Sequence, residues 1–159
     1  MADVAARLAE LGFELPAVAT PAGAYVPAVR TGSYVYTAGQ LPFVDGALPS
    51  TGKVGEGEGL VDPVAAKEYA ATSALNALAA AASVLDSLDD VVRVVKVTGF
   101  VASDPAFSGQ PGVINGASEL LGRVFGDAGV HARSAVGVAV LPLDSPVEVE
   151  IVLEVRPLV

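Results

Sequence analysis

The chain has 159 residues, 52% of them hydrophobic, and a formal net charge of -9 at pH 7. This length fits one domain with a full core, and no apolar run reaches the roughly 18 residues that a membrane helix needs. An acidic surface repels phosphate backbones, which argues against nucleic acid as the main partner. Because the chain contains no cysteine, disulfides, thiolate metal sites and a cysteine nucleophile are excluded.

The composition also bears on assembly and location. The mean hydropathy of +0.56 is high for a soluble protein, and a subunit interface is the natural place for surplus apolar surface. The first residues alternate charged and apolar types and lack the basic-then-apolar order of a signal peptide. We therefore expect a cytoplasmic protein that has no membrane segment and that associates with itself.

Residues 1–21 are predicted to be an N-terminal extension made of a helix and a connector. Residues 2–11 place apolar side chains on one helical face, and Gly12 then ends the helix. Two short apolar runs follow, Tyr25–Arg30 and Tyr34–Ala38. The Gly-containing turn between these runs favours a β-hairpin.

A loop, a long helix and a central strand are predicted next. Residues 43–61 are rich in Gly and small polar residues, which is typical of a loop. Asp62 and Pro63 supply an N-cap acceptor and a first-turn proline, and the Ala-rich segment to about residue 85 has a high helix propensity. Val91–Ser103 is mostly β-branched and predicts a strand. The inward stripe of the helix is predicted to be Val64, Ala71, Leu75, Leu78, Ala82 and Leu85.

The last part of the chain predicts a helix and two strands. Gly112–Phe125 has helical periodicity. Arg133–Leu141 and Val147–Val155 are predicted to pair as a hairpin, because prolines and an aspartate between them favour a turn. The second of these strands alternates apolar residues with glutamates, as expected for a sheet with one buried face. The inward residues of the helix are predicted to be Val113, Ala117, Leu120 and Val124.

The elements together run helix, β, β, long loop, α, β, α, β, β. This order predicts an α+β sandwich with two helices packed on one face of a mixed sheet. No internal repeat or change of composition marks a boundary, so residues 1–159 are interpreted as a single domain.

Arg133 is the strongest candidate for chemistry, because it stands at the head of an otherwise apolar strand. Its forked guanidinium can hold a carboxylate through two parallel hydrogen bonds, although a surface arginine or an ion pair is also open. Glu148 is its most interesting potential partner. In a simple hairpin the two residues would lie about seven positions, and so more than roughly 20 Å, apart. A site that uses both would then need a second subunit.

Other polar positions each allow two interpretations. His131 is the only histidine; it cannot form a histidine metal cluster, and it is either a loop residue or an acid/base group beside Arg133. Gly39 either ends a strand or lets a ligand approach the backbone. Asn115 either caps a helix or points into a cleft, and Tyr25 is either a ligand-facing phenol or a half-buried strand residue. With one histidine and no G-x-S-x-G elbow, a serine-hydrolase triad has little support.

Several segments together resemble the YjgF/RidA family of reactive-intermediate deaminases, in the order in which that family carries them. The resemblance covers about residues 22–156, and it is the combination of segments at these spacings that is specific. The segments are Gly23-Ala24-Tyr25-Val26, Ala38-Gly39-Gln40-Leu41-Pro42, Thr98-Gly99-Phe100-Val101, Asn115, Ala132-Arg133-Ser134, Leu141-Pro142 and Val147-Glu148-Val149-Glu150.

The resemblance implies a chorismate-mutase-like sandwich that forms a homotrimer with ligand clefts between subunits. The implied reaction is hydrolysis of enamine or imine intermediates, such as 2-aminoacrylate, to a 2-keto acid and ammonia. Arg133 would bind the substrate carboxylate and Glu148 would position or activate the water. Tyr25 and Asn115 match further cleft residues, and the backbone at Gly39 would face the ligand. No cofactor is implied, because an iminium carbon is already electrophilic.

The chain departs from the family archetype at two positions. Ala38 stands where the archetype usually has serine, and Ala135 stands in the substrate-binding region where it often has cysteine. These changes leave a non-catalytic trimer that binds a small carboxylate metabolite as the main alternative. An endoribonuclease, a label that the family sometimes carries, is less favoured because of the acidic charge balance.

Overall fold

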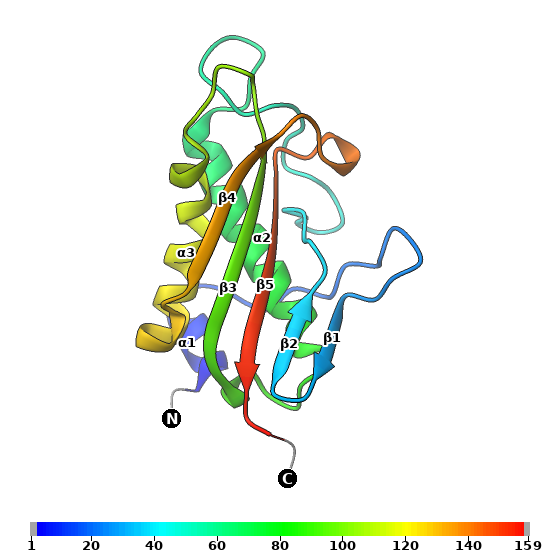
Figure 1. Cartoon of the computed structure of the whole chain (residues 1–159), viewed down its shortest axis with the longest axis vertical. Coiled ribbons are helices and arrows are strands. Elements are labelled where there is room, and N and C mark those ends of the chain that lie inside the picture. The colour runs from blue at the N-terminus through cyan, green and yellow to red at the C-terminus, as the bar shows by residue number, and fades with distance from the viewer. Residues whose placement is uncertain (1–2, 158–159) are drawn as a thin grey trace.

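The computed structural model describes residues 3–157 as a layer of helices against a layer of strands (Figure 1). The predicted helix start at residue 2 lies outside the described residues. The helices are α1 (Val4–Glu10), α2 (Pro63–Ala82) and α3 (Gln110–Phe125). The strands are β1 (Ala28–Thr31), β2 (Tyr34–Thr37), β3 (Val91–Ala102), β4 (Ala132–Val138) and β5 (Val147–Val155). Short 3-10 turns occupy η1 (Leu88–Asp90), η2 (Gly126–Gly129) and η3 (Pro142–Asp144).

The sheet is mixed, as predicted. Its strand order is β1-β2-β5-β3-β4, in which β3 and β4 are parallel and the other neighbouring pairs are antiparallel. Both long helices, α2 and α3, lie on one side of this sheet (Figure 1). The prediction of two helices on one face of a mixed sheet is therefore confirmed.

The predicted hairpin between the last two strands is wrong, because β3 lies between β4 and β5. The connection from β3 through α3 returns the chain to the same end of the sheet, so β4 pairs in parallel with β3. The chain then crosses the end of β3 through η3, where Leu143 has φ +57°, and descends antiparallel on the other edge of β3. The strongly apolar β3 thereby pairs along both edges.

Side-chain burial confirms some of the predicted inward faces and corrects one. The alternating apolar positions of β5 (Val147, Val149, Ile151, Leu153 and Val155) are buried, and so are the predicted inward residues of α3. The predicted stripe of α2 is wrong at its start, since Val64 is 70% exposed. The buried face of α2 consists largely of alanines, whose small side chains allow the helix to approach both the sheet and α3. They are Ala66, Ala70, Ala74, Ala77, Ala79, Ala80 and Ala81.

The predicted loop between β2 and α2 is present and is anchored to the end of β3. Val54 is fully buried, its amide donates to Ala102 O at 2.6 Å, and its carbonyl accepts from the Asp104 amide at 2.9 Å. These bonds hold the middle of the loop against the sheet. Within residues 3–157, none of the helices has the length and the apolar character that crossing a bilayer demands.

Gly116 is expected to control how closely α2 and α3 pack. A Cβ at this position would collide with the backbone carbonyl of Lys67, whose carbon would lie 2.8 Å away. Gly116→Ala should therefore lower the free energy of unfolding by about 1–3 kcal/mol, because backbone cannot move as a side chain can. Gly122→Ala on the same helix meets nothing within 4 Å and should stabilise by about 0.5–1 kcal/mol. Chemical denaturation of both variants checks the pair, and equal stability of the two would contradict it.

Candidate active site

Arg133 is held by the N-terminal half of α3. In β4 it pairs with Val97, a fully buried residue of the parallel strand β3, so both side chains point toward the helices. The Nη1 of Arg133 donates to Asn115 Oδ1 at 2.8 Å and to Ser118 Oγ at 3.2 Å, and Nη2 donates to Pro111 O at 3.3 Å. Asn115 is therefore not the helix cap, which is Gly109. The cap interpretation of Asn115 is therefore wrong, and its place in a ligand cleft stays a prediction.

A second pair of side chains extends this cluster. His131 Nε2 lies 2.9 Å from Ser118 Oγ, and His131 Nδ1 lies 2.6 Å from Gly129 O. Sequence reasoning considered His131 and Asn115 but did not identify Ser118 as the residue that connects His131 to Arg133. The available signal was that Asn115 and Ser118 are three residues apart on one helix, and hence on one face.

Glu148 occupies a different place, on the face of the sheet away from the helices. Its neighbours in the strand, Val147 and Val149, are buried on the helix face, so Glu148 points the opposite way. The backbone of Gln40 exchanges hydrogen bonds of 2.8 and 3.0 Å with Val149. This exchange holds Gly39 directly over the half-buried Glu148 carboxylate. Burial, and then the charge of Glu150, raise the pKa of Glu148 above its usual value.

Gly39 is expected to matter because its missing side chain makes room for that carboxylate. A Cβ at this position would overlap Glu148 Oε1 and lie 2.8 Å from its Cδ. Because a carboxylate at the end of a flexible side chain can swing away, Gly39→Ala should displace Glu148 and leave the fold intact. If Glu148 has the catalytic role that the family resemblance implies, turnover should fall by roughly tenfold or more, as for other misplaced catalytic groups, with an unchanged melting temperature. Wild-type turnover in this variant would contradict the proposed placement of Glu148.

Arg133 and Glu148 lie on opposite faces of the sheet within one chain. Arg133 is level with Val97 of β3, and Glu148 is level with Phe100 of the same strand. They are thus about 10 Å apart along the strands and about 10 Å across them. The distance of more than 20 Å deduced from a hairpin is wrong, because β3 replaces the hairpin pairing. The two residues still cannot meet in one protomer, because the sheet itself separates their side chains.

The remaining predicted site residues divide between these places. Ala135 lies on β4 beside Arg133 and packs against the core. Ala38 directly precedes Gly39 and is part-buried. Tyr25 is 52% exposed in the loop before β1, and its hydroxyl accepts from the Ala22 amide at 3.2 Å. Because β1 and β4 are the two edges of the sheet (Figure 1), the loop that carries Tyr25 leads into one edge and Arg133 lies in the other.

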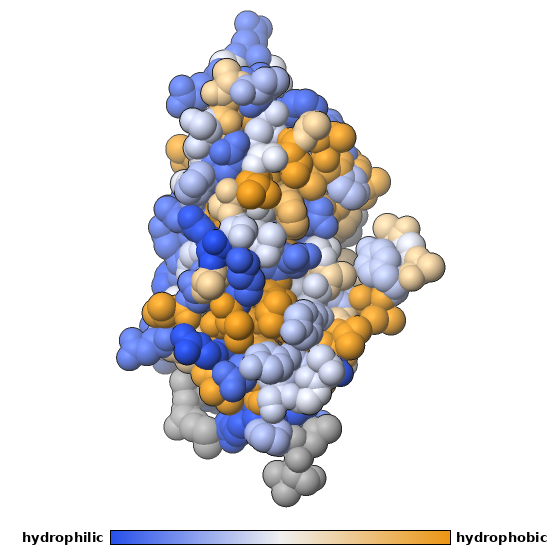
Figure 2. Space-filling model, viewed as in Figure 1, coloured by the Kyte–Doolittle hydropathy of each residue, from blue (hydrophilic) through white to orange (hydrophobic). Residues whose placement is uncertain are grey.

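The face of the sheet that carries Glu148 is open and partly apolar. Figure 2 shows hydrophobic patches among hydrophilic ones on this side of the molecule. Strand register places Val29, Tyr36 and Val136 on this face. Their exposed fractions are 51%, 48% and 44%. Apolar side chains of this size in one sheet face are typical of a surface that another chain covers.

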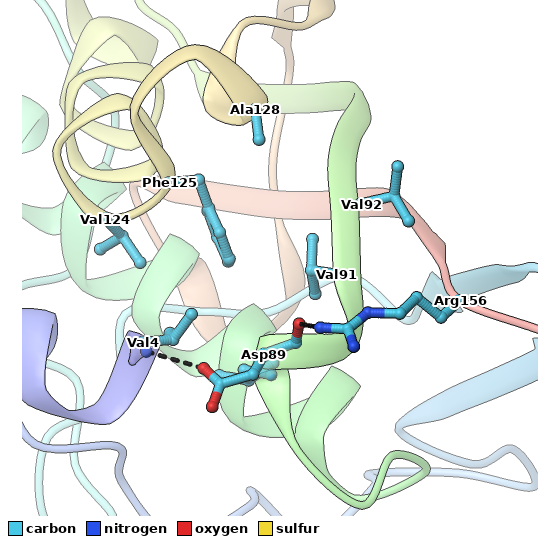
Figure 3. A pocket seen from close by; sticks show the side chains of 9 residues that line it. Val4, Asp89, Val91, Val92, Val124, Phe125, Ala128 and Arg156 are labelled. Atoms are coloured by element: carbon cyan, nitrogen blue, oxygen red, sulfur yellow. Dashed lines mark hydrogen bonds between the residues drawn. The ribbon is translucent and has the colours of Figure 1, made fainter. Parts of the chain in front are cut away.

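One charged hollow elsewhere in the molecule does not contain the predicted site residues. It has a volume of about 390 Å³ and lies between α1, η1 and the end of α3. Its polar groups are used internally: Asp89 Oδ1 accepts from the Val4 amide, and Arg156 donates to Asp89 O (Figure 3). No three His, Cys, Asp or Glu side chains of residues 3–157 come close enough together to hold a metal ion.

Comparison with known proteins assigns the chain to a family. Residues 5–155 match the family model described as "YjgF/chorismate_mutase-like, putative endoribonuclease". The chain therefore belongs to the YjgF/chorismate-mutase-like family, which confirms the resemblance seen in the sequence.

Individual relatives agree with this assignment. Protein TCP17 of Trypanosoma cruzi is 44% identical over 154 residues, which are 96% of this chain and 94% of that protein. The crystal structure of Atu1372 from Agrobacterium tumefaciens has a TM-score of 0.86 at 43% identity, over 96% and 92% of the two chains. Escherichia coli TdcF, solved with bound serine, has a TM-score of 0.57 at 28% identity, over 89% and 94%.

Proposed function

We propose that this protein is a hydrolytic deaminase that converts reactive enamine or imine intermediates, such as 2-aminoacrylate, to 2-keto acids and ammonia. The reaction takes place in clefts between the subunits of a homotrimer. The observation that carries the proposal is that Arg133 and Glu148 lie on opposite faces of one sheet. Arg133 is hydrogen-bonded to residues of α3, and Glu148 is half-buried. Each protomer thus offers one half of a site at each of two surfaces.

Arg133 provides the anion-binding half. Its guanidinium is directed by Asn115 and Ser118, so little side-chain entropy is lost when it binds a carboxylate. A substrate with a carboxylate next to the C=N carbon would be held with that carbon in a fixed position. The serine bound to the relative TdcF is a small amino acid with such a carboxylate.

Glu148 provides the water-activating half. The enamine first takes a proton on its terminal carbon and loses one from its nitrogen, and so becomes the imine. Glu148 then removes a proton from a water molecule, whose oxygen adds to the C=N carbon while the nitrogen takes up a proton. The resulting carbinolamine collapses with loss of ammonia, so that one water is consumed and one keto acid and one ammonia are formed. A pKa raised by burial makes Glu148 a stronger base for this task than an exposed glutamate.

The homotrimer brings the two halves together in the proposed arrangement. The open sheet face with its exposed apolar side chains supplies contact surface, and the exposed Tyr25 loop extends from the edge opposite Arg133. A cyclic assembly repeats one heterologous contact, so each cleft combines the Arg133 edge of one subunit with the Glu148 face of the next. Light scattering at micromolar concentration should give three times the mass of the chain.

A trimer that only binds a small carboxylate is the second candidate, and Ala38 and Ala135 favour it. Each lacks the polar atom of the serine or cysteine that the family archetype carries, so neither side chain can form a hydrogen bond with a ligand. Cleavage of RNA, suggested by the family description, has less support because the chain carries a net charge of -9.

Keto-acid release from an imine generated in situ tests the proposed function. A PLP-dependent serine dehydratase supplies 2-aminoacrylate, and the appearance of pyruvate is followed with and without this protein. Acceleration by a catalytic amount supports deamination. Tight binding of 2-oxobutanoate without acceleration supports the binding-only trimer, and salt-sensitive RNA cleavage would support the third alternative.

Mixing two inactive variants should restore activity if each cleft takes its residues from two subunits. Arg133→Ala and Glu148→Gln chains are co-expressed with different tags, and mixed trimers are isolated through both tags. In each isolated mixed trimer, one of the three clefts, about a third, would combine an intact Arg133 from one chain with an intact Glu148 from the other. Mixed trimers as inactive as their parents would show that the two residues do not act across a subunit boundary.

A further inference from the structure

Four groups form a continuous hydrogen-bonded row behind the proposed carboxylate site. They are Gly129 O, the His131 imidazole, the Ser118 hydroxyl and the Arg133 guanidinium, joined at 2.6, 2.9 and 3.2 Å. All three side chains are part-buried. None of these contacts is required by secondary structure, because Ser118 lies in α3 and His131 precedes β4.

The groups at the two ends of the row determine which atom donates in each of its hydrogen bonds. A carbonyl oxygen only accepts, so His131 Nδ1 must carry a hydrogen. The Arg133 guanidinium only donates, so Ser118 Oγ accepts from it. In the neutral imidazole Nε2 is then an acceptor, and it receives the Ser118 hydroxyl hydrogen. Every donor in the row therefore has one acceptor, and the hydroxyl hydrogen points away from Arg133.

We propose that Ser118 and His131 are positioning residues that fix Arg133 for carboxylate binding, and that protonation of His131 strengthens this binding. The inference rests on the carboxylate-binding role proposed for Arg133. When Nε2 takes up a proton it donates to Ser118 Oγ, which can accept from His131 and Arg133 together. The hydroxyl hydrogen then turns away from the imidazole and is free to donate to an anion held beside Arg133.

The charges around His131 support the direction of this effect. Arg133 reaches it through Ser118, and Arg93 of β3 donates to the adjacent carbonyl of Val130 at 3.2 Å. Glu119 of α3 pairs with Lys67 of α2 at 3.0 Å, and η2 contributes the exposed Asp127. A carboxylate bound at Arg133 would offset the nearby positive charge. Anion binding and protonation of His131 should therefore favour each other.

Imidazole NMR tests the row without any ligand. Because the chain has a single histidine, one set of ring signals reports His131 unambiguously. Long-range ¹H–¹⁵N correlation at about pH 8 should show the Nδ1–H tautomer. Ser118→Ala should admit the Nε2–H form, and Ser118→Thr, which keeps the hydroxyl, should restore the Nδ1–H form. An Nε2–H tautomer in the unaltered protein would overturn the proposal.

Calorimetric binding of 2-oxobutanoate tests the effect on Arg133, since this probe has a carboxylate and no amine. For the unaltered protein we expect binding to tighten several-fold between about pH 8 and pH 6. Ser118→Ala and His131→Gln should weaken binding about fivefold at the higher pH, the effect of one hydrogen bond, and should flatten the pH dependence. The same profile is measured in a Glu148→Gln background, so that titration of that glutamate does not contribute. Ser83→Ala, which removes a serine hydroxyl at the distant end of α2, should change nothing.

The outcomes separate this inference from the proposed function. Unchanged affinity and pH dependence in Ser118→Ala and His131→Gln would overturn the positioning role while leaving the carboxylate site in place. Binding with the expected profile but without imine turnover would leave the positioning role intact and remove the deaminase. No binding of 2-oxobutanoate by the unaltered protein at any pH would overturn both the carboxylate site and its positioning.

Discussion

Replacing Arg133 with alanine is expected to lower kcat/KM for an imine substrate by about 100-fold or more. Two charge-assisted hydrogen bonds to a carboxylate are each worth roughly 1.5–3 kcal/mol, and each 1.4 kcal/mol is a factor of ten. Part of the loss should appear in the affinity for 2-oxobutanoate, because the arginine binds substrate and transition state alike. Coupled assays and calorimetry on the same preparation measure the two quantities.

Two further variants make the result for Arg133 specific. Arg133→Lys keeps the charge and loses the planar fork, so we expect an intermediate loss. Arg123→Ala removes an exposed arginine in the last turn of α3 and should leave kcat/KM unchanged. The Arg133→Ala chain should stay folded and trimeric, because its partners Asn115 and Ser118 lie at an edge that water can reach. Wild-type affinity in Arg133→Ala would remove this residue from the site.

The sequence predicted which face of each strand is buried better than it predicted which strands pair with one another. Alternation in Val147–Val155 revealed its buried face, because period-2 patterns report which side chains point inward. Such a pattern does not say which strand lies alongside. The assumption that consecutive strands pair failed at β4 and β5 because the helical crossover returns β4 to β3. The prediction of the buried face of α2 was wrong for another reason. Alanines occur on all sides of this helix, so the sequence offers no contrast that would mark Val64 as exposed.

Only part of the candidate site could be predicted from the sequence. Arg133 and Glu148 are charged residues in apolar strands, and such contrasts can be seen without a structure. The contact between Ser118 and His131 spans the end of α3 and the η2 turn, where no simple periodicity links residues thirteen positions apart. The sequence suggested a second subunit because an assumed hairpin placed Arg133 and Glu148 too far apart to act together, and that distance was wrong. The structure supports the same requirement through the opposite faces on which the two residues lie.

Glu148→Gln is expected to reduce kcat by about 100-fold, within the range for loss of a general base, while 2-oxobutanoate still binds. Glutamine fills the space beside Gly39 but cannot accept a proton from water. The variant should also be at least as stable as the unaltered protein at neutral pH. Because burial raises the pKa of Glu148 in the folded state, the folded chain binds a proton there more readily than the unfolded chain. Its ionised form therefore costs stability as pH rises through that raised pKa, and glutamine removes this cost.

The pH profile of kcat gives the sharpest test of this role. Glu148 must be ionised to act as a base, so activity should fall on acidification through its raised pKa, at a higher pH than for an exposed glutamate. Glu150→Gln removes the like charge that adds to the shift, and should move the acid limb to lower pH while activity at about pH 8 is retained. Glu154→Gln, on the same strand face but beyond Val152, should leave the limb in place. If the acid limb persists unchanged in Glu150→Gln, another group controls it, because a neighbouring charge that raises the pKa of Glu148 cannot be removed without lowering that pKa.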